Sequence, residues 1–118
     1  MAYYFLFPES DATVYSQPDR IKLNTGGDEI LELVKERGTT SNTLFPSRML
    51  LKFKNEEIKS LISDTITHVN FNKLGSQVNL ELTSVEAKNL VEVVNIDVFA
   101  VSQSWNEGTG KYSNIPTG

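Results

Sequence analysis

The chain has 118 residues, of which 15 are acidic and 11 basic, and it carries a formal charge of −4. This length suits a single domain, and the absence of cysteine excludes disulfides, thiolate metal sites and a cysteine nucleophile. A single histidine excludes any metal motif that needs a histidine pair, and the acidic balance argues against nucleic-acid binding. No window approaches the ~18 unbroken apolar residues of a membrane-spanning helix. The composition therefore indicates a folded domain without a membrane segment.

The first predicted element is a strand over residues 3–7, a run rich in aromatic side chains. Pro8 is expected to end it, because proline cannot donate to a strand ladder. The same run lacks the basic flank and the length of a signal peptide, so we expect no export signal. A second short strand is predicted over residues 12–16.

The middle of the chain predicts strands and one helix. Residues 29–35 fit either a helix or a strand, and their short length between glycines favours a strand. A polar loop is expected over residues 38–47. Residues 48–54 alternate between apolar and polar side chains, as a half-buried strand does. Asn55 and the two glutamates after it suit a helix start, which predicts a short helix near residues 55–63.

The second half of the chain predicts further strands. Residues 78–83 and 94–101 alternate between apolar and polar side chains, with turn-forming residues between the two runs. We therefore expect an all-β fold, an antiparallel β-sandwich or jelly roll with one short helix. Residues 1–104 are assigned to the sandwich, and residues 105–118 to a carboxy-terminal loop or the start of a continuation.

No constellation of residues predicts catalysis. His68 has no suitable partner nearby in the sequence and is expected to be structural or solvent-facing. The carboxylates of Asp11, Asp19, Asp28 and Glu29 lie in or near predicted turns, at spacings that match no EF-hand calcium loop. We expect no catalytic residue, no metal site and no cofactor.

Aromatic side chains at both ends of the chain are candidate contacts with a partner or a glycan: Tyr3, Tyr4, Phe5, Trp105 and Tyr112. Trp105 and Tyr112 together could stack on a sugar ring. The alternative is that Trp105 folds back over the open end of the sandwich. The sequence leaves both interpretations open.

Four short motifs occur in a fixed order: A-T-V-Y-S at 12–16, N-T-G-G at 24–27, S-R-M-L-L-K-F at 47–53 and W-N-E-G-T-G at 105–110. This order resembles virion structural proteins of tailed bacteriophages, especially of cyanophage and marine types. It is also similar to the DNRLRE-type jelly-roll modules of surface and secreted proteins. The positions that the resemblance marks as structural are Asn24, Gly26, Gly27, Arg48, Trp105 and Gly108.

The resemblance implies a non-enzymatic structural component of a virion, in the head, neck, tail or baseplate, synthesised in the host cytoplasm. Its partners would be other virion proteins and copies of itself, with no nucleic acid and no membrane. Modules of this type continue beyond the W-x-E-G-T-G segment. We therefore expect either a longer protein or strands supplied by a neighbour, which implies an unpaired sheet edge. The alternative function is a carbohydrate-binding β-sandwich module of a tail fibre or surface protein.

Overall fold

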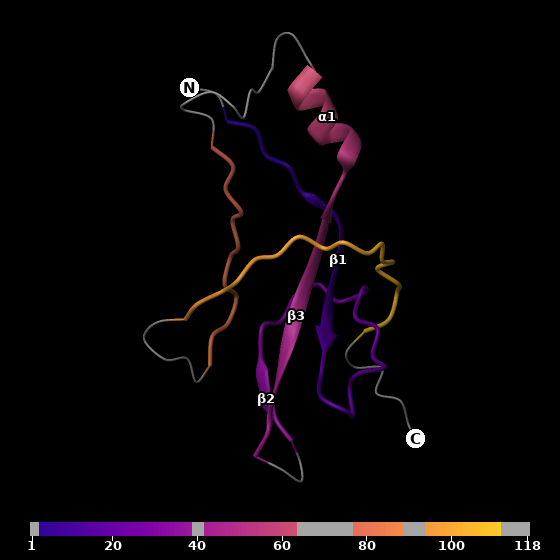
Figure 1. Ribbon diagram of the computed structural model, residues 1–118, viewed down its shortest axis with the longest axis vertical. Coiled ribbons are helices and arrows are strands. Elements are labelled where there is room, and N and C mark those ends of the chain that lie inside the picture. The colour runs from indigo at the N-terminus through magenta and orange to yellow at the C-terminus, as the bar shows by residue number, and fades with distance from the viewer. Residues whose placement is uncertain (1–2, 39–41, 64–76, 89–93, 112–118) are drawn as a thin grey trace. The chain divides into compact units, whose positions relative to one another are not determined.

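The computed structural model describes residues 3–38, 42–63, 77–88 and 94–111. These residues form two compact units, of which the first joins Met1–Ser60 to Trp105–Gly118 and the second is Leu61–Ser104. Figure 1 labels the elements that the structure contains: β1 (Pro8–Tyr15), β2 (Lys35–Arg37), β3 (Leu44–Phe53) and α1 (Asn55–Ser63). The described residues are therefore rich in strand with one short helix, as the sequence predicts.

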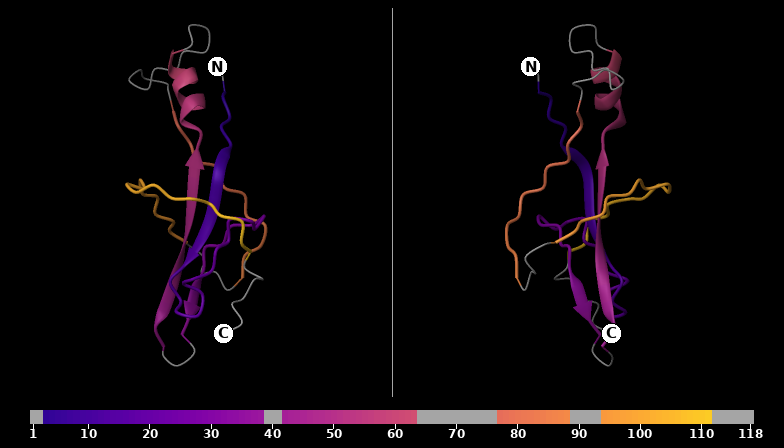
Figure 2. Two further views of the ribbon diagram at one scale, coloured as in Figure 1. Left: turned by 90° about the vertical axis from the view of Figure 1, so that its right-hand side faces the viewer. Right: turned by 60° about the vertical axis from the view of Figure 1, so that its left-hand side comes forward.

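The three strands form one small antiparallel sheet in the order β1-β3-β2, seen from two further directions in Figure 2. β1 pairs with β3 so that Thr13 lies opposite Met49, and a bulge at Glu9 shifts the register near Pro8. β2 pairs only with the first part of β3, where Lys35 lies opposite Pro46. The sheet is open, and no second sheet is present among the described residues.

β1 begins where the sequence predicted a strand to end. The predicted strand over residues 3–7 is wrong, because no strand is formed there and the ladder starts at Pro8 opposite Phe53. Proline is tolerated at the first position of an edge strand, where a missing N–H leaves no gap in the ladder. The short strand predicted over residues 12–16 is confirmed as the second half of β1.

β2 is shorter and later than the strand predicted over residues 29–35. Most of that prediction is wrong, because residues 29–34 form no ladder: two side chains bind their backbone, and β3 contributes one hydrogen bond, from the Ser47 N–H to the Val34 carbonyl at 2.8 Å. The Ser47 hydroxyl accepts a hydrogen bond from the Val34 N–H at 2.9 Å and donates to the Glu32 carbonyl at 2.8 Å. The Glu32 N–H donates to the Thr13 hydroxyl at 3.0 Å.

β3 starts earlier than predicted. Within the expected loop over residues 38–47, the Gly38 N–H donates to the Thr43 carbonyl at 3.0 Å. This brings β2 alongside Leu44–Pro46 and adds four residues to the predicted strand. The sequence gives little sign of this start, because proline usually interrupts a strand. In the structure Pro46 lies within β3, and its carbonyl accepts a hydrogen bond from the Ser16 hydroxyl at 2.6 Å.

α1 confirms the helix predicted near residues 55–63. The N–H groups of Glu57 and Ile58 donate to the Lys54 carbonyl, which begins the helix. Glu56 and Glu57 lie in the first turn, where carboxylates suit the positive end of the helix dipole. These signals are local, so the sequence alone suffices to place the helix.

The second unit contains no strand among its described residues. Residues 78–83 and 94–101 keep their alternating pattern, but neither run pairs with a neighbour, and both are exposed throughout. The two predicted strands are therefore not formed in this structure. Alternation only marks which side chains could share a face, whereas a strand also needs a backbone partner.

The buried centre of the described structure is small and mostly polar. Its buried hydrophobic residues are Ala12 and Tyr15. Its buried polar residues are Thr13, Gln17, Thr25 and Ser47. The hydrogen bonds among these buried polar groups locate the candidate site.

Candidate interaction site

Two glycine-rich loops, residues 24–27 and 107–110, lock together; we call this contact the glycine interlock. The Asn24 side chain is at its centre. Its Nδ2 donates to the Glu107 carbonyl at 3.1 Å, and its Oδ1 accepts from the N–H groups of Gly26 at 3.1 Å and Gly110 at 2.8 Å. The Gly27 N–H donates to the Gly110 carbonyl at 2.7 Å. The interlock thus joins segments separated by more than 80 positions in the sequence.

The interlock requires glycine because the two backbones touch. A Cβ atom on Gly26 would collide with the Glu107 carbonyl. Gly108 has a φ of +75°, in the left-handed region that glycine adopts without steric cost, and a Cβ there would collide with the Asn24 amide. The glycines therefore allow an approach that a side chain would prevent.

The interlock also covers the outer edge of β1. The Glu107 carboxylate accepts a hydrogen bond from the Asp11 N–H at 2.8 Å. The Thr25 hydroxyl accepts from the Thr13 N–H at 3.0 Å and donates to the Thr13 carbonyl at 2.6 Å. Thr25 and Thr13 are only 2% and 3% exposed. Side chains therefore satisfy backbone groups that an edge strand would otherwise offer to another strand.

A second set of polar contacts fixes the inner side of the loop before β2. The Tyr15 hydroxyl donates to the Glu32 carboxylate, and Tyr15 is 3% exposed. Arg20 forms an ion pair with Glu36. These contacts hold residues 32–36 beside β1 and β3 and so stabilise the face next to the interlock.

Four of the six residues that the sequence marked as structural lie in the glycine interlock. Asn24, Gly26 and Gly27 form one side, and Gly108 the other. Arg48 lies apart, exposed on β3 opposite Val14, and has no ion pair with a described carboxylate.

The candidate aromatic contacts differ in exposure. Tyr3 and Phe5 are 74% and 72% exposed, Tyr4 is less so, and Trp105 is half-buried. Tyr112 lies outside the described residues. The segment before β1 is therefore an exposed aromatic run. Trp105 is neither buried nor fully exposed.

Thr13, Thr25 and Glu107 are central to the site, yet sequence reasoning did not single them out. All three residues lie inside the four ordered motifs, so the motif order held the only available signal. Thr13 occupies an alternating strand where a polar residue is expected to face outward. Its burial is explained by the Thr25 hydroxyl, which pairs with the Thr13 backbone, and by the Glu32 N–H, which donates to the Thr13 hydroxyl.

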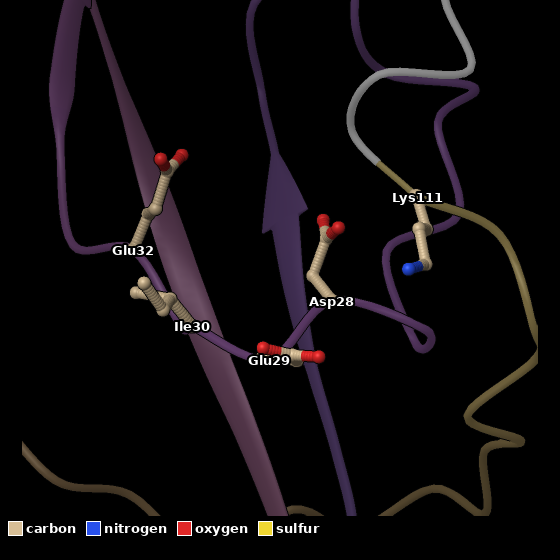
Figure 3. A pocket seen from close by; sticks show the side chains of 5 residues that line it. All are labelled: Asp28, Glu29, Ile30, Glu32 and Lys111. Atoms are coloured by element: carbon tan, nitrogen blue, oxygen red, sulfur yellow. The ribbon is translucent and has the colours of Figure 1, made fainter.

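A shallow hollow of about 370 Å³ lies beside the interlock, and Figure 3 shows its lining side chains: Asp28, Glu29, Ile30, Glu32 and Lys111. Its carboxylates do not converge on a common point, and the described residues contain no cluster of histidine or carboxylate side chains able to hold a metal ion. Glu32 is already engaged by Tyr15. The hollow therefore presents a mostly acidic surface beside the interlock.

No protein-family model matches the sequence, and no curated protein or solved structure is significantly similar to it. Within the described residues, α1 is too short to cross a membrane. Function is therefore inferred from the residues themselves: the glycine interlock, the small core and the exposed apolar side chains.

Proposed function

We propose that this chain is a non-enzymatic structural component of a tailed-phage virion, in the head, neck, tail or baseplate, and acts through protein–protein packing. Its partners are other virion proteins and copies of itself. We further propose that its open sheet is part of a β-sandwich or jelly roll that is complete only in the assembled particle.

The observation that carries this proposal is the glycine interlock. The N-T-G-G and E-G-T-G pieces of the phage-like motif order come from opposite ends of the sequence, and they meet around the Asn24 side chain. The A-T-V-Y-S piece forms the strand whose edge they cover. An ordered set of motifs that builds one contact supports the resemblance more strongly than separate short matches do.

The distribution of apolar side chains also supports a packing role. Large hydrophobic side chains that are 71–81% exposed occur in both units, among them Phe5, Phe7, Val78, Val98 and Phe99. Exposed apolar surface of this kind is typical of protein interaction sites. Burial against neighbouring subunits would remove it from water and supply the stability that the small core lacks.

The second candidate function is a carbohydrate-binding module of a tail fibre or surface protein. The observation that supports it is that Trp105 is half-buried, because a partly exposed indole retains a face for sugar stacking. Glycan-array binding that is lost in Trp105→Ala, and kept in Phe99→Ala, would favour this function over packing.

The test of the proposed function is the protein content of particles purified from the phage that encodes the chain. Mass spectrometry should find its peptides at a constant ratio to the major capsid protein after density-gradient purification. Peptides that occur in the infected lysate but not in the particles would refute the proposal.

A further inference from the structure

We infer that the free edge of β3 is a strand-addition site for a second copy of this chain, and that the added strand is residues 78–82. The inference deepens the proposed packing function and rests on it.

The edge is defined by which backbone groups of β3 already have partners. β2 reaches only Leu44–Pro46, and the Ser47 N–H on the same side donates to Val34 at 2.8 Å. Because paired and unpaired residues alternate along an antiparallel strand, the N–H and C=O groups of Met49, Leu51 and Phe53 face this side. No described residue pairs with them. Figure 1 shows β3 continuing well past β2.

The two edges of the sheet differ in how they are protected. On β1, side chains of Thr25 and Glu107 occupy the outward N–H groups of Thr13 and Asp11. On β3, no described side chain occupies the outward groups over residues 49–53. Natural proteins cover edges that must not pair. Covering one edge and leaving the other free marks β3 as the pairing edge.

Residues 78–82 match this edge in length and pattern. Val78, Leu80 and Leu82 alternate with polar residues, are 46–75% exposed, and belong to no strand in the structure. In an antiparallel register with Val78 opposite Phe53, Leu80 lies opposite Leu51 and continues the half-buried apolar face. Residues 94–101 match less well, because they would place apolar side chains on both faces.

Charge complementarity favours the same segment. The register that aligns the apolar residues places Glu81 opposite Leu50, diagonally between Arg48 and Lys52. Diagonal neighbours on one face of a sheet lie within reach of long side chains. Arg48 and Lys52 are exposed on β3, and Lys52 forms a long ion pair with Glu9 at 3.7 Å. Glu81 therefore supplies a further acidic group to this basic face.

Disulfide trapping tests the inference, because the chain has no cysteine of its own. Lys52→Cys and Asn79→Cys are made in separate full-length copies with different tags, then mixed and oxidised. The proposed register makes these positions a pair whose backbones do not hydrogen-bond to each other, where Cα atoms are about 4.5 Å apart and a disulfide can close. The expected product is a mixed disulfide at twice the 13.2 kDa chain mass.

Two controls make the result specific. Lys52→Cys mixed with Lys88→Cys should give little product, since Lys88 is also exposed but lies outside the segment. Leu80→Pro in the Asn79→Cys copy should abolish the product, because it removes an N–H that donates to β3. Leu80 belongs to no strand, so this change leaves the sheet intact.

The outcomes are distinct. Equal yields with Asn79→Cys and Lys88→Cys, or a yield unaffected by Leu80→Pro, would overturn the strand assignment. A further variant carries both Lys52→Cys and Asn79→Cys in one chain. If it closes a disulfide within that chain while the mixed single variants do not react, the choice of a second copy is overturned. Neither result bears on the particle composition that tests the proposed function.

Discussion

Replacing Asn24 with alanine should destabilise the first unit by removing the centre of the glycine interlock. The Asn24 side chain donates one hydrogen bond, to Glu107, and accepts two, from Gly26 and Gly110. A typical hydrogen bond contributes about 0.5–1.5 kcal/mol net, and Asn24 is exposed, so we expect a total loss of about 2 kcal/mol. For a unit of this size that corresponds to a melting temperature lower by about 8–16 °C.

Urea unfolding followed by tryptophan fluorescence measures this effect, because Trp105 is the only tryptophan and directly precedes the interlock in the sequence. The variant should unfold at lower urea with a similar slope, and its native emission should shift to longer wavelength as Trp105 becomes more exposed. Asn106→Ala is the matched control. Asn106 is an exposed neighbour whose side chain makes no hydrogen bond with a described residue.

The reasoning would be refuted if Asn24→Ala and Asn106→Ala unfolded at the same urea concentration with the same native emission. In that case the loops would be held together by other contacts. A lower midpoint for Asn24→Ala together with an unchanged emission would confirm the energetic role and place Trp105 outside the region that the interlock controls.

Three further changes test separate contacts. Gly108→Ala should cost about 2 kcal/mol or more in unfolding free energy, because its positive φ disfavours a side chain and the Cβ meets Asn24; an unchanged urea midpoint would contradict the close approach of the two loops. Thr25→Val should cost about 2 kcal/mol by leaving the buried backbone groups of Thr13 unpaired, whereas Thr25→Ser should cost much less; equal thermal midpoints for the two would contradict the hydroxyl's role. Glu81→Lys should weaken self-association by about threefold in sedimentation velocity, and adding Lys52→Glu should restore part of it; no recovery would argue against the charge pairing.

The helix and the second half of β1 could be predicted because their signals are local. Asn55 and the acidic first turn define the start of α1 within a few residues. The alternation around Met49 and Leu51 predicts a strand in the right place, although β3 begins four residues earlier. Prediction from sequence is strongest where a short window contains the determining contacts.

The interlock could not be derived in the same way, because its partners are more than 80 positions apart. The motif order marked Asn24 and Gly108 as structural, but nothing in either loop indicates that the two meet. The strand expected before Pro8 and the later alternating runs were predicted from local pattern and are not formed. Their side chains suit a sheet, but none of these segments joins a strand ladder in the structure.

The most direct test of the central claim is cross-linking mass spectrometry of intact, purified particles. We expect cross-links from lysines of this chain, Lys52 and Lys88 among them, to other virion proteins and between copies of the chain itself. Particles that contain the chain but yield only links within single copies would contradict a role in packing. Particles that lack the chain altogether would contradict the assignment to a virion.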